Sequence, residues 1–214
     1  MSKSTLLISL GINCEASFQI QRRYLALDSF IFSWAWIPNE KCLISAIRNP
    51  DSIGSEGFKI NYDTGDMCIC NRTGMKFHGR KKISTLKDES EIKDFLREVS
   101  ERTDYLKKKF SQAIQSESKK IFIFKRPEKI LTNLTDFSEE LRLALLFAGA
   151  KNFEMVIISH KKYHEPVLNI PGVYNHYLDR YSPFNNVSDA CVVSWDRIFD
   201  ELEFGNPLTK NLIS

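Results

Sequence analysis

The stretch Leu6-Leu-Ile-Ser-Leu-Gly-Ile-Asn-Cys-Glu15 decides the fold. Its apolar run predicts a buried strand over residues 5–10 that ends at Gly11, and helical spacing begins at Glu15. Cys14 therefore lies in a turn from strand to helix, where open α/β sheets place reactive groups. A thiol at a helix N-terminus is expected to have a lowered pKa, because the helix dipole and backbone N–H groups stabilise the thiolate. We expect Cys14 to be a nucleophile; the alternative is a small, buried and inert cysteine.

The rest of the chain alternates strands with helices. Further strands are predicted at 120–124, 153–158 and 173–178, and helices at 15–27, 40–48, 91–115, 137–149 and 195–203, the last capped by Ser194. Residues 57–79 differ, because short alternating segments separated by turn sequences predict small antiparallel strands. We therefore expect an α/β fold in a single domain over residues 1–214, with a mostly parallel sheet, helices on both of its faces and this antiparallel excursion.

Composition narrows the class of protein. Lys and Arg total 30 and Asp and Glu 27, a net charge of +3, which is too small to predict nucleic-acid binding without a clustered patch. No apolar run approaches the length of about 20 residues that a transmembrane helix needs. The five cysteines are an odd number in a chain without a signal peptide, which predicts a reducing cytoplasm. We expect a cytoplasmic protein acting on a small-molecule, peptide or glycan substrate.

A cysteine nucleophile needs a base, usually a histidine. The chain offers four, and their sequence positions do not choose among them: His78, His160, His164 and His176. Two of them, His160 and His164, form a potential zinc site with Cys68 and Cys70. However, Cys-x-Cys on a strand puts both thiols on one face without the two-residue loop usual in zinc sites, so no metal site is predicted.

Several motifs resemble those of a known family. Ser9-Leu-Gly-Ile-Asn-Cys-Glu15, Gln19-Ile-Gln-Arg-Arg23 and Phe32-Ser-Trp34, with the later Phe77-His78, resemble a bacterial family of papain-like cysteine peptidases of unknown function. The resemblance covers nearly the whole chain, and its Leu-Gly-x-Asn-Cys element is the most specific part. It implies a thioester mechanism with Cys14 as nucleophile and His78 as base.

One departure from the family concerns the third catalytic group. The family shows Pro-Phe-Asp-Trp where this chain has Ile31-Phe-Ser-Trp34, so the hydroxyl of Ser33 replaces a carboxylate. If that position orients the histidine, Ser33 supplies only a neutral hydrogen bond. Asn13 or Glu15 are alternative helpers beside the nucleophile, and the N–H groups of Cys14 and Glu15 are expected oxyanion donors. A second reading of Asn13 is a left-handed turn residue.

The remaining candidates concern substrate binding. The aromatic residues Phe32, Trp34 and Trp36 are expected to wall a pocket. Arg22 and Arg23 are expected to reach the same cleft and to bind a carboxylate or phosphate. A looser resemblance, resting on Asn-Cys alone, is to polysaccharide-cluster acyltransferases that use coenzyme A thioesters. The sequence thus favours an acyl-transfer enzyme of the peptidase or hydrolase class, with two alternatives: a coenzyme A-dependent acyltransferase acting on a polysaccharide or glycan precursor, and a binding domain with a decayed site.

Overall fold

A parallel sheet forms one half of the molecule. The computed structural model describes residues 5–25, 28–63, 65–128, 132–163, 168–183 and 186–204. Sheet A has the strand order β1-β6-β7-β8, with every neighbouring pair parallel. Its strands are β1 (Leu6–Ser9), β6 (Lys120–Lys125), β7 (Phe153–His160) and β8 (Val173–Leu178). All residues of β6 and residues 155–159 of β7 are buried, as expected for parallel strands covered on both faces.

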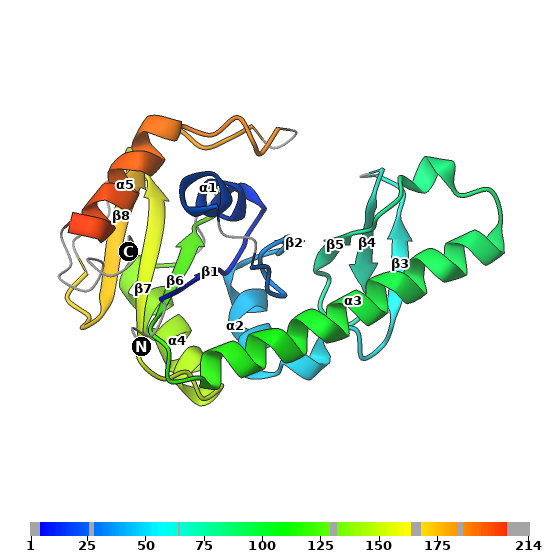
Figure 1. The fold of residues 1–214 in the computed structure, drawn as a ribbon, viewed down its shortest axis with the longest axis horizontal. Coiled ribbons are helices and arrows are strands. Elements are labelled where there is room, and N and C mark those ends of the chain that lie inside the picture. Colours follow the sequence, from blue (N-terminus) through cyan, green and yellow to red (C-terminus); the bar gives the residue numbers. More distant parts are fainter. Residues whose placement is uncertain are drawn as a thin grey trace.

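Helices cover both faces of sheet A (Figure 1). The first face packs against α1 (Glu15–Tyr24) and α5 (Val192–Phe204), and the second against α2 (Glu40–Arg48) and α4 (Leu134–Phe147). Alternation along the strands divides the core, because neighbouring residues point to opposite faces. Ile121 and Ile123 join the cluster of α1 and α5, whereas Phe122 and Phe124 join the larger cluster. The predicted α/β fold is confirmed.

The antiparallel excursion is a second sheet. Sheet B has the order β2-β5-β4-β3, with antiparallel pairing throughout. Its strands are β2 (Ala35–Trp36), β3 (Phe58–Asn61), β4 (Met67–Cys70) and β5 (Lys76–His78). The expected strands within residues 57–79 are therefore present. The aromatic stretch before Pro38 adds β2, which at two residues is too short to show a period in the sequence.

The long helix α3 (Glu89–Gln115) joins the two sheets. It runs from the far side of sheet B to the start of β6, as Figure 1 shows. Its buried stripe includes Phe95 and Val99 near sheet B and Phe110 and Ile114 further along, all in one hydrophobic cluster. This cluster is continuous between the two sheets, so the position of sheet B is fixed by packing and not by a linker.

Some predicted boundaries need correction. Ser194 lies inside α5 and does not cap it; its hydroxyl bonds Asp179 and the Cys191 thiol instead. Helix α4 begins three residues before the predicted start, because the Asn133 side chain accepts hydrogen bonds from the N–H groups of Thr135 and Asp136. In the described ranges, no helix has the length together with the apolar character that a membrane crossing requires.

Short 3-10 turns complete the described secondary structure. They are η1 (Pro50–Ser52), η2 (Ile83–Thr85) and η3 (Lys161–Tyr163). The first follows α2, the second leads from sheet B into α3, and the third follows β7. The carbonyl of Gly65, in the β3–β4 turn, accepts a hydrogen bond from the N–H of Ile83 over 2.7 Å. This bond ties the chain after β5 to the turn between β3 and β4.

Candidate active site

The turn after β1 presents Cys14 at the start of α1. Gly11 makes the turn possible, because its φ of +84° lies in the left-handed region and an added Cβ would stand 2.6 Å from Cδ1 of Ile37. The N–H of Ile37 donates to the carbonyl of Ile12 over 3.0 Å, which fixes the turn against β2. Cys14 then occupies the N-cap position of α1, and its carbonyl accepts the first helical bond, from Phe18.

His78 and Asp66 complete a linear arrangement with Cys14. The Cys14 Sγ lies 3.8 Å from His78 Nε2, and His78 Nδ1 lies 2.9 Å from Oδ2 of Asp66. His78 ends β5 and Asp66 immediately precedes β4, where Met67 pairs with His78 in register. The strand pairing therefore places the carboxylate beside the imidazole. Cysteine, histidine and carboxylate in this order form the pattern of a nucleophile, a base and a group that orients the base.

Gly79 allows α3 to pack directly behind the base. A Cβ on this residue would lie 1.9 Å from Cε2 of Phe95, a distance that no folded protein tolerates. The N–H of Gly79 donates to the carbonyl of Asp66 over 2.8 Å. Histidine and carboxylate are thus linked by backbone as well as by side chains, and the ring of Phe95 holds this edge of the sheet in place.

Burial makes the resting thiol neutral. The side chain of Cys14 is only 6% exposed, and this burial, with the nearby charge of Asp66, raises the pKa of Cys14 to about 11. The expected lowering of its pKa by the helix N-terminus is therefore wrong, because loss of water outweighs the dipole here. His78 and Asp66 retain 36% and 41% exposure of their side chains, so the site opens to solvent on the imidazole side.

Ser33 does not orient the base. Its hydroxyl accepts a hydrogen bond from the N–H of Phe30 over 3.0 Å, inside a buried turn. Asp66, which no motif singled out, occupies the orienting position instead. The only sequence signal for it was the turn Asp63-Thr-Gly-Asp66 ahead of β4, and a turn is the commonest meaning of such a sequence.

Asn13 and Glu15 also differ from their expected roles. Asn13 does not have a left-handed backbone, and its Oδ1 accepts a hydrogen bond from the N–H of Glu15 over 3.1 Å. That N–H is consequently engaged within the turn and is not directed at a substrate. The Glu15 carboxylate points away from the thiol into the core, where its Oε2 lies 2.9 Å from Nζ of Lys125.

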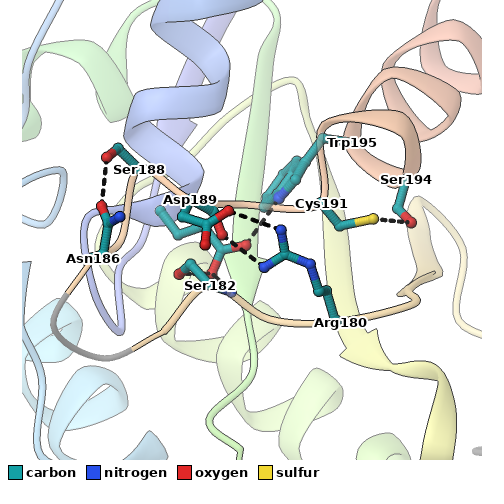
Figure 2. A network of polar contacts seen from close by, with 9 residues as sticks. Arg180, Ser182, Asn186, Ser188, Asp189, Cys191, Ser194 and Trp195 are labelled. Atoms are coloured by element: carbon teal, nitrogen blue, oxygen red, sulfur yellow. Dashed lines mark hydrogen bonds and ion pairs between the residues drawn. The ribbon is translucent and has the colours of Figure 1, made fainter.

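Glu15 instead ties α1 to the segment that follows β8. Its carboxylate accepts hydrogen bonds from the Trp195 indole over 3.0 Å and from the Ser182 hydroxyl over 2.6 Å. Figure 2 shows Ser182 and Trp195 pointing inward while Arg180 faces Asp189 across the same segment. Because Glu15 is completely buried, these partners compensate its charge. Glu15 is therefore a structural residue under the nucleophile.

The expected substrate-binding residues lie elsewhere. Phe32 is fully buried and packs edge-on against Phe110 of α3, with ring centroids 5.1 Å apart. The Trp34 indole donates to the Ser29 hydroxyl and its ring packs on that of Phe18. The guanidinium groups of Arg22 and Arg23 pair with carboxylates of α5, at Asp196 and Asp200. Arg22 and Arg23 thus join α1 to α5, and none of the four is among the described residues that line the cavity beside the nucleophile turn.

A small cavity does adjoin the nucleophile turn. It has a volume of about 180 Å3 and lies beyond the carboxyl ends of β1 and β6. Of the expected aromatic wall, only Trp36 is among the residues that line it, together with Tyr181. The complete lining is Ile12, Asn13, Trp36, Ile37, Pro38, Lys125, Pro127, Glu128, Tyr181 and Ser182. Its position at the strand ends is where ligands bind in open α/β sheets.

The other histidines have different partners. His176 Nδ1 lies 2.9 Å from Glu201 of α5, and burial lowers the pKa of His176. His160 packs on Tyr163 and Tyr181 at the end of β7, and His164 lies outside the described residues.

The potential zinc ligands are not assembled. Cys68 and Cys70 lie in sheet B, and the Cys68 thiol donates to the carbonyl of Phe77, whereas His160 belongs to sheet A. Over the described part of the chain, no group of three or more His, Cys, Asp or Glu side chains is placed to hold a metal ion.

Comparisons with protein-family models, with curated proteins and with solved structures find no match. The geometry of Cys14, His78 and Asp66 is therefore the main indication of function in this protein.

Proposed function

We propose that this protein is a cysteine-dependent acyl-transfer enzyme in which Cys14 is the nucleophile, His78 the base and Asp66 the group that orients the base. The observation that carries the proposal is the pair of contacts of one imidazole, with Nε2 3.8 Å from the thiol and Nδ1 2.9 Å from the carboxylate. A contact of 3.8 Å is long, but catalytic hydrogen bonds are often long without substrate and shorten in the reacting complex.

The neutral thiol determines the order of proton transfers. With the pKa of Cys14 at about 11, His78 Nε2 takes the thiol proton as the sulfur attacks the substrate carbonyl. The Asp66 carboxylate stabilises the imidazolium that forms, and the N–H of Cys14 is the nearest candidate donor to the oxyanion. The imidazolium then protonates the leaving group, which leaves an acyl group on Cys14 as a thioester. A second nucleophile, activated by His78, releases it.

The resemblance to papain-like cysteine peptidases places hydrolysis, including that of peptides, first among the reactions. The same residues serve an acyltransferase when the second nucleophile is a hydroxyl or amine and not water. The decayed-site alternative rested on the missing carboxylate at Ser33, and Asp66 now supplies that carboxylate. A cytoplasmic location belongs to the proposal, because all five cysteines are free thiols.

The test compares two thiols of the same acidity. Burial raises the pKa of Cys42 to about 11, as for Cys14, but the Cys42 thiol donates to the carbonyl of Thr73 and not to an imidazole. Incubation with p-nitrophenyl acetate at pH 7.5, followed by peptide mapping, should show acetyl groups on Cys14 well before Cys42. The His78→Ala variant should lower the rate at Cys14 by at least about 100-fold, the size of a general-base contribution, and leave Cys42 unchanged. Equal rates at the two thiols would contradict the proposal.

A further inference from the structure

The register of sheet B aligns four side chains in one row across its strands. Trp36 of β2 pairs with Lys76 of β5, Lys76 with Ile69 of β4, and Ile69 with Lys59 of β3. Residues directly opposite one another in antiparallel strands lie on the same face of the sheet. The row therefore crosses all strands of sheet B on a single face and carries one aromatic ring and two ammonium groups.

This face points away from the core. The neighbouring row, made of Ala35, Phe77, Cys68 and Ile60, belongs to the large hydrophobic cluster with Phe95 and Val99 of α3. Successive residues of a strand alternate between faces, so α3 covers the opposite side. Consistent with this, Lys59 is exposed and Trp36, Ile69 and Lys76 are half-buried.

The row leads to the catalytic residues. His78 lies two positions after Lys76 on β5, about 7 Å along the strand and on the same face. Trp36 lines the cavity that Asn13 shares, and the Lys76 Nζ stands 4.6 Å from the centre of the Trp36 ring. A molecule lying along the row would therefore reach the nucleophile turn with one end.

The row and the segment that follows it carry several cations, while the nearby Asp66 carboxylate is paired with His78. Arg80, Lys81 and Lys82 follow directly after His78 and Gly79 and are all exposed. Many lysines elsewhere have carboxylate partners, such as Lys109 with Asp28 and Lys151 with Glu117. By contrast, none of the described carboxylates pairs with Lys59, Lys76 or the run 80–82. Cations clustered without counter-ions beside a reactive site attract anionic substrates.

We propose that this open face of sheet B binds the phosphate groups of a phosphate-bearing acyl thioester, which donates its acyl group to Cys14. The inference rests on the proposed function and names its donor. Lys76 and Lys59 stand two strands apart, about 10 Å, so they suit an extended anion with several phosphates better than a single carboxylate. Lysine binds phosphate as a point charge, without the planar geometry that arginine requires.

The transfer step is balanced without any further reactant. The Cys14 sulfur attacks the thioester carbonyl, and its proton passes to His78 Nε2. The attack forms a bond between the acyl carbon and Cys14 Sγ. The bond between the acyl carbon and the donor sulfur then breaks. The proton on His78 then passes to the departing thiolate, so the donor leaves as a thiol. No electron is gained or lost by the protein.

The experiment compares two donors with the same reacting group. Acetyl-coenzyme A carries phosphates, whereas S-acetyl-N-acetylcysteamine has the same thioester without them. We expect Cys14 to be acetylated faster by acetyl-coenzyme A than by the donor without phosphates. Intact-protein mass spectrometry at low salt measures the two rates. The double substitution Lys59→Gln/Lys76→Gln should reduce the rate with acetyl-coenzyme A about tenfold, the combined size of two exposed ion pairs, and leave the rate with the neutral donor unchanged. Added salt should reduce only the rate with acetyl-coenzyme A.

The matched control is Lys93→Gln, an exposed lysine on α3, which covers the opposite face of the sheet. It should leave both rates unchanged. Two results would overturn the phosphate-binding face and leave acyl transfer by Cys14 intact. One is equal rates with both donors, and the other is a rate with acetyl-coenzyme A that the double substitution does not change. Faster acetylation from an acidic acyl carrier protein than from acetyl-coenzyme A would overturn the assignment to a donor that carries several phosphates.

A binding measurement separates the two proposals if neither donor acetylates Cys14. That result counts against the proposed function alone. Calorimetric titration of the Cys14→Ser variant with coenzyme A then decides the further inference by itself. Salt-sensitive binding that is lost in the Lys59→Gln/Lys76→Gln background supports the phosphate-binding face, and no binding overturns it.

Discussion

At the scale of single residues, Asp66 acts on both of its neighbours. Its carboxylate lies 2.9 Å from Nδ1 of His78, and its charge disfavours the Cys14 thiolate. We predict that Asp66→Asn slows acylation of Cys14 about tenfold or more, because a charge-assisted hydrogen bond becomes neutral. The same variant should speed alkylation of Cys14 by iodoacetamide at pH 9, because the pKa of the thiol falls when the negative charge is removed.

Ser33→Ala is the control for this prediction. It removes a hydroxyl that bonds only within its own turn, so both rates should stay at the wild-type value. If acylation and alkylation of the Asp66→Asn variant fell together, the variant would have disturbed the turn and not the electrostatics. A loss of acylation in Ser33→Ala alone would restore Ser33 as the orienting group.

The sequence indicated the candidate nucleophile more directly than the side chains that lie next to it. Cys14 follows from local signals: an apolar run, a glycine and the start of a helix, all within a few residues. His78 required the family resemblance, because four histidines were equally acceptable on sequence alone. The role of Asp66 could not be predicted from the sequence, because it depends on the pairing of β4 with β5. The register of that pair, and not the position in the chain, brings Asp66 next to the imidazole of His78. Glu15, beside Cys14 in sequence, has its carboxylate bonded to Ser182 and Trp195.

At the scale of elements, the fit of β5 against α3 controls the position of the base. We predict that Gly79→Ala destabilises the protein by about 1–3 kcal/mol, as overpacking does, and slows acylation of Cys14. The added Cβ would overlap the Phe95 ring, so strand or helix must shift. Thermal unfolding and acetylation rates of the purified variant measure the two effects.

Phe95→Leu supplies the partner variant for a double-mutant cycle. The smaller side chain should restore part of both the stability and the rate of Gly79→Ala, because it removes the overlap. In the wild-type background, Phe95→Leu should lower stability and change the rate less. Independent effects of the two substitutions would show that the contact does not position His78.

Elements with a clear period were predictable, including the short strands within residues 57–79, whereas the two-residue strand β2 was not. The apolar run 120–124 and the stripe of α3 gave a strand and a helix close to those observed. Strand β2 has two residues, and its place in sheet B depends on pairing with β5. The aromatic residues around it were expected to wall a pocket because they lack a period. Phe32 is instead fully buried in the core, where its ring packs edge-on against that of Phe110.

At the scale of the whole molecule, buried thiols make stability depend on alkaline pH. Burial raises the pKa of Cys14 and Cys42 to about 11 and that of Cys68 to about 12. An unfolded cysteine has a pKa of about 8.5, so the folded state holds these protons more tightly. The resulting stability is complete below about pH 8.5 and is lost as the pH rises through about 11 to 12. Lys120 acts in the opposite direction, because burial lowers its pKa.

Urea unfolding at pH 8 and pH 10.5 measures this effect. We predict that the unfolding midpoint falls with pH in the wild type and falls less in Cys68→Ala, which lacks one buried thiol. Val99→Ala is the matched control, because it opens the same hydrophobic cluster without removing a titrating group. It should lower the midpoint at both pH values and keep the wild-type difference between them. Identical pH dependence in Cys68→Ala and the wild type would contradict the prediction.

The division of the site between two sheets has an evolutionary consequence. Cys14 lies in the turn after β1, whereas His78 and its carboxylate partner lie together in the short stretch from Asp66 to His78. A recombination event or a small insertion in that stretch exchanges the acid–base pair in one step and leaves the codons for the nucleophile turn untouched. Changes confined to this single hairpin can therefore alter the proposed acid–base pair without altering the turn that carries Cys14.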